Sequence, residues 1–243
     1  MAAGEKPMDA FGKKIICALD TSDLDEAFRT VRLLKDHVRA FKIGHALTLN
    51  YGISVIEQLR EAGAPRIFLD LKFHDIPNSV GLAVREAARY GAWMVTVHTV
   101  GGPAMMAAAA QEARAYGEES APCVVGVSVL TSLDQHTLTD HLGVNRTIEE
   151  HMVYLSKLAI DCDLDGLVCS PHEIKAIRDA IGHRGLIVTP GIRLATGDMH
   201  DQRRVGDART AIADGADYLV IGRALTGSAD PIAMLGQMAA VPA

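Results

Sequence analysis

Two patterns of apolar residues alternate along this chain: short β-branched runs, and longer segments in which apolar positions recur with the helical period. The short runs predict eight strands, at residues 14–20, 40–44, 66–73, 94–98, 123–130, 166–170, 186–190 and 218–222. The longer segments predict helices over residues 24–36, 54–62, 77–90, 103–116, 147–160, 172–181 and 231–238. Strands that alternate with helices in this way indicate a parallel sheet with crossover helices.

The number and spacing of these units favour one closed barrel. Eight strands with crossover helices in 243 residues match a single-domain (β/α)8 TIM barrel, which typically has ~250 residues. We expect residues 1–12 to form a poorly structured N-terminal head and residues 13–243 to form the barrel catalytic domain. The competing architecture is an open, doubly wound sheet. It is disfavoured because no strand–turn–helix carries the Gly-x-Gly-x-x-Gly fingerprint of a dinucleotide crevice.

Composition and charge narrow the class of protein. A net charge of −6 and a pI near 5.9 argue against sequence-independent nucleic-acid binding, which requires many Lys and Arg contacts to phosphates. The four cysteines lack metal-finger spacing and lie in apolar surroundings, as free thiols of a reducing compartment do. Neither a signal peptide nor an apolar run of ~18 residues is present. We therefore expect a cytoplasmic protein with no nucleic-acid and no membrane partner.

The most unusual segment is Phe68-Leu69-Asp70-Leu71-Lys72-Phe73-His74-Asp75-Ile76-Pro77, where charged residues interrupt an apolar run. Buried charges are costly unless they are paired, so this arrangement is unlike ordinary packing. In an extended strand, side chains alternate between faces, which puts Asp70 and Lys72 on one face and places Asp75 just beyond the strand. A structural Asp–Lys salt bridge is the simpler interpretation of this segment alone.

Polar residues lie late in the predicted strands, or directly after them, at the same end. Because barrel active sites are built at the carboxyl ends of the strands, these residues are expected to meet on one rim. They are Asp20, Lys42, Asp70, Lys72, His98, Thr131, Ser132, Arg193, Gly222 and Arg223. Their convergence favours a catalytic site over a series of isolated structural charges.

The turns after the last two strands fit a phosphate site. Gly191 and Gly222 let backbone N–H groups approach an anion, and Arg193 and Arg223 supply guanidinium donors. The polar segment at residues 194–206 lies between these turns. It is either an ordinary exposed loop or, as its position favours, a lid over a bound ligand.

With these residues in place, the chain resembles the orotidine 5′-phosphate decarboxylase family along nearly its whole length. The matching segments are Ala18-Leu19-Asp20, Lys42-Ile43-Gly44, Asp70-Leu71-Lys72-Phe73-His74-Asp75-Ile76, Val129-Leu130-Thr131-Ser132, Pro190-Gly191-Ile192-Arg193, Asp201-Gln202-Arg203-Arg204-Val205 and Ile221-Gly222-Arg223. The Asp-x-Lys-x-x-Asp element is shared with a wider barrel superfamily, whereas the full set is more specific.

The resemblance implies a cofactor-free decarboxylation of orotidine 5′-phosphate to UMP in de novo pyrimidine biosynthesis. Lys72 would protonate C6, flanked by Asp70 and by Asp75 of the other subunit of a homodimer, with Lys42 completing the charged array. Asp20 and Lys42 would hold the ribose hydroxyls, with Asp75 and Ile76 reaching in from the other subunit. The other implied substrate-binding residues are Ser79, Thr131 at the pyrimidine, and Gln202, Gly222 and Arg223 at the phosphate with Arg193 nearby.

The chain departs from the family pattern at three places. Ser79 stands where Thr is usual, Gly206-Asp207 replaces a common Thr-Pro, and Ala224-Leu225 replaces a more usual Pro-Val or Pro-Ile. No charged residue of the implied site is lost, so the departures affect the expected lid dynamics more than the chemistry.

Two alternatives remain open at this point. A sugar-phosphate decarboxylase or synthase of the same superfamily needs a divalent metal, which is bound by a carboxylate at the end of the second strand. This chain has Lys42 there, and a cation would repel the metal, so we predict no metal site. The second alternative is a non-catalytic phosphate-binding barrel. It is disfavoured because every catalytic charge is present together with the phosphate-binding glycines.

Overall fold

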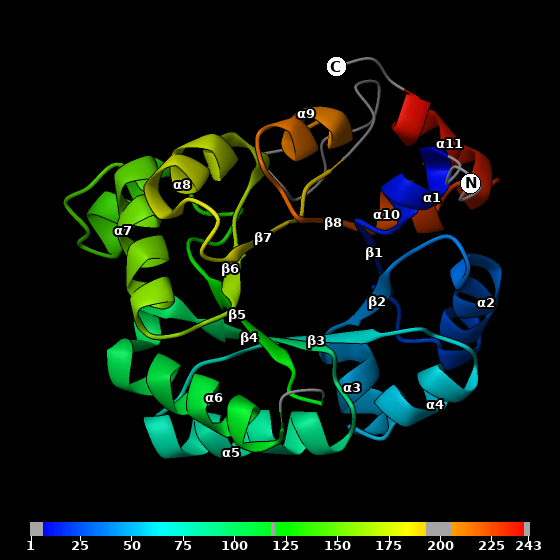
Figure 1. The fold of residues 1–243 in the computed structure, drawn as a ribbon, viewed down its shortest axis with the longest axis horizontal. Coiled ribbons are helices and arrows are strands. Elements are labelled where there is room, and N and C mark those ends of the chain that lie inside the picture. The colour runs from blue at the N-terminus through cyan, green and yellow to red at the C-terminus, as the bar shows by residue number, and fades with distance from the viewer. Residues whose placement is uncertain (1–6, 118–119, 193–205, 241–243) are drawn as a thin grey trace, which may run out of the picture.

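The eight strands form a closed parallel barrel, so the prediction of a (β/α)8 architecture is confirmed (Figure 1). The computed structural model describes residues 7–117, 120–192 and 206–240. The strands are β1 (Ile15–Ala18), β2 (Ala40–Ile43), β3 (Ile67–Phe73), β4 (Met94–His98), β5 (Cys123–Val127), β6 (Gly166–Val168), β7 (Leu186–Thr189) and β8 (Tyr218–Ile221). Each strand pairs with its neighbours in chain order, and β1 pairs with β8 to close the ring.

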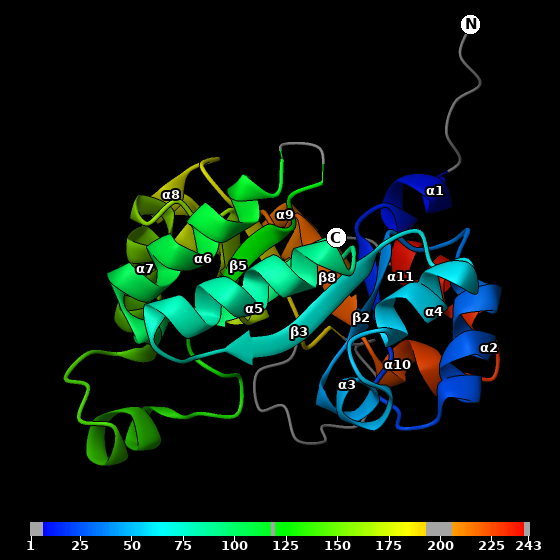
Figure 2. The ribbon, with the colours of Figure 1, turned by 90° about the horizontal axis from the view of Figure 1, so that it is seen from below.

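Helices cover the outside of this ring (Figures 1 and 2). They are α1 (Pro7–Gly12), α2 (Leu24–Leu34), α3 (His45–Tyr51), α4 (Val55–Glu61), α5 (Pro77–Arg89), α6 (Pro103–Ala115), α7 (Ile148–Asp161), α8 (Ile174–Ile181), α9 (Ala208–Ala213), α10 (Arg223–Thr226) and α11 (Pro231–Ala240). Short non-α turns of helix lie at η1 (Thr99–Gly101), η2 (Thr137–His141) and η3 (Pro171–Glu173). No helix among the described residues is long and apolar enough to cross a membrane.

Local sequence explains where the longer helices begin. The Asp23 carboxylate accepts hydrogen bonds from the first backbone N–H groups of α2. Thr147 and Glu150 form a reciprocal capping box at the start of α7. A proline occupies the first helical position of α5 and of α6, where its missing N–H costs no hydrogen bond. These signals fix the helices relative to the strand ends that carry the polar residues.

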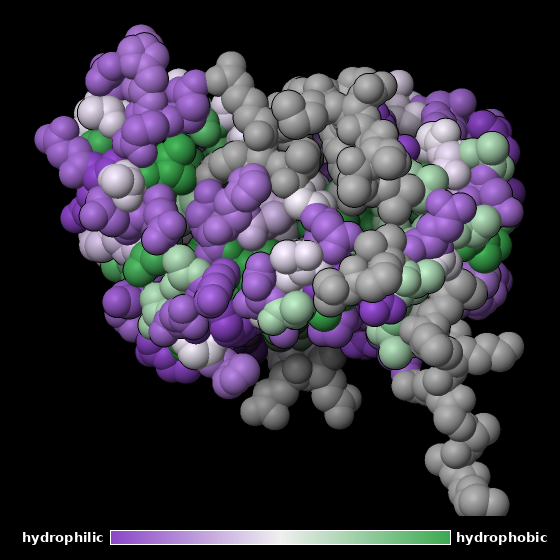
Figure 3. Space-filling model, turned by 90° about the horizontal axis from the view of Figure 1, so that it is seen from above, coloured by the Kyte–Doolittle hydropathy of each residue, from purple (hydrophilic) through white to green (hydrophobic). Residues whose placement is uncertain are grey.

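Side chains of the strands divide between two apolar layers. One cluster fills the barrel interior and contains Ile16, Ala18, Ala40, Phe68, Met94, Val125, Val188 and Val220. The larger cluster lies between the barrel and the helices. On the side drawn in Figure 3, hydrophobic residues form small separate areas among hydrophilic ones, as expected for outward faces of amphipathic helices. The apolar interior therefore ends near the carboxyl rim, where charged side chains replace it.

The structure differs from the predicted elements in several places. Residues 7–12 form α1, which packs against α11, and Phe11 is buried, although we expected this segment to belong to a poorly structured head. The sequence pattern did not predict α3, α9 or α10, which have seven, six and four residues. Strand β5 ends at Val127, and the long connection to α7 reaches past the barrel on the side of the strand ends (Figure 2).

Candidate active site

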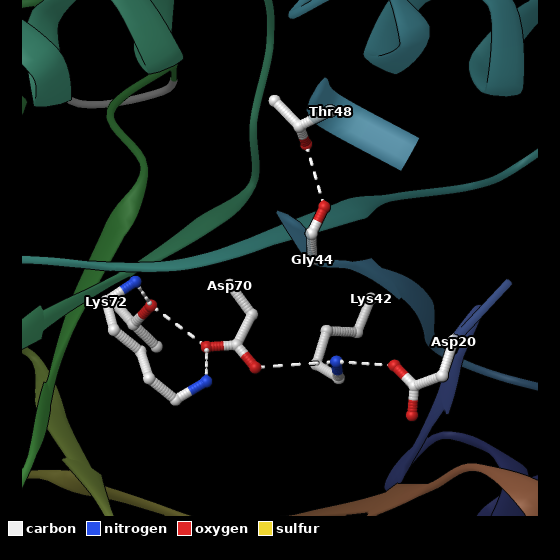
Figure 4. Close-up of polar contacts among 7 residues, drawn as sticks. Asp20, Lys42, Gly44, Thr48, Asp70 and Lys72 are labelled. Carbon is white, nitrogen blue, oxygen red and sulfur yellow. Dashed lines mark hydrogen bonds and ion pairs between the residues drawn. The ribbon is translucent and has the colours of Figure 1, made fainter. Parts of the chain in front are cut away.

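A line of alternating charges crosses the carboxyl ends of the first three strands (Figure 4). Lys42 Nζ lies 3.1 Å from Oδ1 of Asp20 and 3.4 Å from Oδ2 of Asp70. Lys72 Nζ donates a hydrogen bond to the other oxygen of Asp70, at 2.8 Å. Four residues from three strands thus form one continuous array, which the sequence predicted from their strand-end positions.

The array is buried at its centre and open at its ends. The side chains of Lys42 and Asp70 are 12% and 13% exposed, whereas those of Lys72 and Asp20 are 32% and 57% exposed. Burial alone would raise the pKa of Asp70, but the ammonium groups of Lys42 and Lys72 outweigh it and hold this pKa below its usual range. Burial likewise opposes charge on Lys42, but Asp70 and Asp20 hold the Lys42 pKa above its usual range. Both central groups therefore remain ionised.

The pairing of strand β3 with β4 is irregular at the residues of β3 that belong to this array. Its register with β4 runs from Leu69 opposite Val95 to Phe73 opposite Val97, so three residues of β3 oppose one residue of β4. Within this bulge the backbone φ of Lys72 is +52°, a left-handed conformation that residues other than glycine rarely adopt. The alternation assumed from the sequence therefore breaks at Lys72, and the bulge, not the pleat, aims its ammonium at Asp70.

The residue opposite the bulge is Thr96 of β4, which the sequence analysis did not single out. Its hydroxyl accepts a hydrogen bond from Lys72 N at 2.8 Å and donates one to Asp70 Oδ1 at 3.0 Å. The available signal was alternation along β4, which puts Thr96 on the same face as the interior residue Met94.

A cavity opens above the array at the mouth of the barrel. Its lining includes Asp20, Lys42, Asp70, Lys72 and Thr131 together with apolar residues of the strand ends. The cavity thus combines fixed charges with apolar walls, as small-molecule sites commonly do. Among the described residues there is no group of three or more His, Cys, Asp and Glu side chains that could hold a metal ion.

The residues after β3 lie away from this cavity. Asp75 is exposed, and its Oδ1 accepts a hydrogen bond from Ile76 N at 2.6 Å. Ile76 is 66% exposed, and Ser79 is half-buried in the first turn of α5. None of Asp75, Ile76 and Ser79 is among the residues that line the cavity of their own chain.

The expected phosphate-binding residues are only partly described. Gly222 follows β8 and lies close to the array, since a Cβ atom added to it would be 3.2 Å from Asp20 Oδ2. Arg223 begins α10 and is exposed. Arg193, Gln202 and the predicted lid at residues 194–206 lie outside the described residues, apart from Gly206, whose backbone N–H donates to Gly191 O at 3.1 Å.

Comparison with known proteins gives a consistent result. A family model described as "Orotidine 5′-phosphate decarboxylase / HUMPS family" matches residues 13–238. The curated orotidine 5′-phosphate decarboxylase of Moorella thermoacetica is 44% identical over 230 residues, covering 93% of this chain and 91% of the relative. The protein of the same name from Pseudoalteromonas translucida is 42% identical over 226 residues, covering 93% and 95%.

Solved structures are similar over the same extent. A crystal structure of orotidine 5′-phosphate decarboxylase from Lactobacillus acidophilus superposes with a TM-score of 0.80 at 33% identity, covering 92% of this chain and 96% of that one. An uncharacterized conserved protein from Geobacillus kaustophilus superposes with a TM-score of 0.80 at 35% identity, covering 92% and 97%.

Proposed function

This chain belongs to the orotidine 5′-phosphate decarboxylase / HUMPS family, and we propose that its Asp20–Lys42–Asp70–Lys72 array performs a metal-free decarboxylation. The overall reaction is the conversion of orotidine 5′-phosphate to UMP and CO2 in pyrimidine biosynthesis. What we propose here is the chemical role of each residue, the absence of a metal, and the assembly of the site from two chains.

The observation that carries the proposal is the position of Lys42. Its ammonium lies between the carboxylates of Asp20 and Asp70 and is 12% exposed. A divalent cation requires oxygen ligands, and a fixed ammonium within 3.4 Å of Asp70 repels such a cation and competes for its ligands. This arrangement favours direct decarboxylation over a reaction that stabilises an enediolate on a metal.

The chemistry follows from where charge develops. When the bond between C6 and the carboxylate breaks, CO2 leaves and the electron pair remains on C6 of the pyrimidine. An ammonium at ~4 Å stabilises this carbanion by about 4 kcal/mol at an effective dielectric of ~20. Lys72 is already aimed by Asp70 and needs no reorganisation as the charge grows. It then donates a proton to C6, which completes UMP.

The remaining residues bind the nucleotide around this centre. Asp20 and Lys42 hold the ribose hydroxyls, and Thr131 contacts the pyrimidine edge from the cavity wall. Gly222, Arg223 and Gln202 hold the phosphate, and Arg193 contributes near it. Binding energy from the phosphate, which does not react, then helps to assemble the site around the pyrimidine.

The site is completed by a second copy of the chain. Asp75 and the 66% exposed Ile76 do not line their own chain's cavity, and Ser79 follows them in α5. In a homodimer, these residues reach the ribose and Lys72 of the partner subunit, where Asp75 becomes the second carboxylate beside the catalytic ammonium. The enzyme acts in the cytoplasm, without a nucleic-acid or membrane partner.

The test is an assay on metal-free protein. Purified protein is treated with a chelator, desalted and incubated with orotidine 5′-phosphate while the ultraviolet absorbance of the pyrimidine is followed. Metal-free turnover supports the proposal. Turnover that requires added Mg²⁺ would contradict the assigned role of Lys42.

A further inference from the structure

Thr96 closes the bulge that carries Lys72. Three residues of β3, from Asp70 to Lys72, lie opposite this single residue of β4, so regular backbone pairing is interrupted there. The hydroxyl of Thr96 takes the place of a backbone acceptor, because Lys72 N donates to it at 2.8 Å. The same hydroxyl donates to Asp70 Oδ1 at 3.0 Å. One side chain thus holds the backbone of the lysine and the carboxylate that aims it.

A hydroxyl suits this position because it has one donor and two acceptor lone pairs. The hydroxyl donates its hydrogen bond to the carboxylate of Asp70, and such charge-assisted hydrogen bonds are stronger than neutral ones. One lone pair of the hydroxyl accepts a hydrogen bond from the N–H of Lys72. The φ of this residue is +52°, a conformation that costs energy and persists only when the surrounding structure holds it. Neither an apolar isostere nor a side chain without an acceptor can do both.

Thr96 acts at a distance from the substrate. It is 1% exposed and is not among the residues that line the cavity. Asp70 Oδ1, which accepts from Thr96, is also the atom that accepts from Lys72 Nζ at 2.8 Å. Any influence of Thr96 on the reaction therefore passes through Asp70 and Lys72.

We propose that Thr96 is a positioning residue, whose hydroxyl sets the backbone of Lys72 and the rotamer of Asp70 so that the ammonium meets C6. This inference rests on the proposed role of Lys72 and Asp70 in the decarboxylation. It predicts that loss of the hydroxyl affects turnover and leaves nucleotide binding nearly unchanged, because the ribose and phosphate contacts come from other elements.

The experiment compares Thr96→Val, which keeps the shape and removes the hydroxyl, with Thr96→Ser, which keeps the hydroxyl. Thr99→Val is the matched control, since Thr99 is also fully buried after β4 and its hydroxyl donates only to Val127 O, at 2.9 Å. For each variant, kcat, KM, the Kd of UMP and the thermal midpoint are measured. Lys72→Ala is assayed in parallel to test the underlying mechanism.

For Thr96→Val, kcat should fall about 10- to 100-fold, as expected when a hydrogen bond to a charged group is removed from the transition state. KM and the Kd of UMP should change less than about threefold, and Thr96→Ser should recover most of kcat. Thr99→Val should lower the thermal midpoint without lowering kcat.

An inactive Lys72→Ala variant shows that the proposed mechanism stands. In that case, two results would overturn the inference about Thr96. One is a wild-type kcat for Thr96→Val. The other is an equal loss of kcat in Thr96→Ser, which would assign the effect to packing of the methyl group. If Thr96→Val does not fold, Thr96→Ala, which also lacks the hydroxyl, takes its place, with the same expected loss of kcat. If Lys72→Ala is active, the proposed mechanism itself has failed.

Discussion

The Nζ atom of Lys42 lies 3.4 Å from Oδ2 of Asp70, so the end of β2 presents a fixed cation to the carboxylate at the centre of the site. Because this ammonium replaces the charge that a bound divalent ion would supply, catalysis should not depend on a metal. We expect activity to survive exhaustive treatment with EDTA, measured as the ultraviolet change of orotidine 5′-phosphate after desalting. Activity lost with EDTA and restored by Mg²⁺ would contradict this prediction.

Replacing Lys72 with alanine should nearly abolish turnover, because it removes both the stabilising cation and the proton donor. We expect kcat to fall by at least ~10³-fold, from the loss of about 4 kcal/mol of electrostatic stabilisation and of general acid catalysis. The Kd of UMP, measured by calorimetry, should change little. Lys175→Ala, in the exposed part of α8, is the control. A Lys72→Ala variant with normal kcat would remove this residue from the chemistry.

Mixing two inactive variants tests whether each site uses two chains. If Asp75 reaches the partner's Lys72, a heterodimer of Lys72→Ala and Asp75→Asn chains has one intact site and one site with both changes. Random exchange of equal amounts makes half of the dimers mixed, which gives about a quarter of wild-type activity. Activity is measured after subunit exchange, and heterodimers are identified by native mass spectrometry. Confirmed heterodimers without activity would place both residues in one chain's site.

The phosphate contact predicts a substrate-dependent effect at Arg223. Arg223→Ala should raise KM for orotidine 5′-phosphate by about 10- to 100-fold, as expected when a charge-assisted hydrogen bond to a phosphate is lost. Exogenous guanidinium should restore part of the activity. The slow reaction of orotidine, which lacks the phosphate, should be unaffected, and steady-state kinetics on both substrates measures the difference. An equal loss with both substrates would argue that Arg223 acts on folding or chemistry instead.

The depressed pKa of Asp70 predicts how stability depends on pH. Burial opposes this shift, but Lys42 and Lys72 dominate, so the ionised carboxylate stabilises the folded state. The contribution is complete above the unfolded-state pKa of about 3.9 and is lost as the pH falls through the lower folded-state value.

Asp70→Asn should therefore lower the free energy of unfolding at pH 7, by about 3–5 kcal/mol, because it leaves two partly buried ammonium groups without their shared partner. The difference from wild type should shrink below about pH 4. Urea unfolding at several pH values measures it, with Asp179→Asn on the exposed surface of α8 as the control. A difference that grows as the pH falls would contradict the sign.

The barrel and most of the charged array could be predicted because both follow from repetition along the chain. Each strand gives a short apolar run. Asp20 follows the first run, and Lys42 and Asp70 interrupt the second and the third. Parallel pairing then brings strand ends together without further information. The helices α3, α9 and α10 were missed because such short helices have little stability of their own and form through packing.

The orientation of Lys72 could not be predicted from its neighbours. Asp70-Leu71-Lys72-Phe73 alternates as an ordinary strand does, and nothing in these four residues signals a bulge or a left-handed backbone. The bulge lies opposite Thr96, which accepts a hydrogen bond from Lys72 N, is 24 positions further along the chain and belongs to an apolar strand. Contacts of this kind are set by tertiary structure, which is why Thr96 was missed while the charged residues of the array were singled out.

The left-handed backbone at Lys72 also sets the conformational preference of position 72 against the proposed role of its side chain. Glycine would adopt φ of +52° without strain, whereas a side chain there destabilises the fold by about 1–2 kcal/mol whether or not substrate is present. The backbone conformation therefore favours glycine at position 72, whereas the ion pair with Asp70 favours the lysine. If Lys72 has the proposed role, position 72 keeps an unfavourable backbone conformation for the sake of the ammonium that it places beside Asp70.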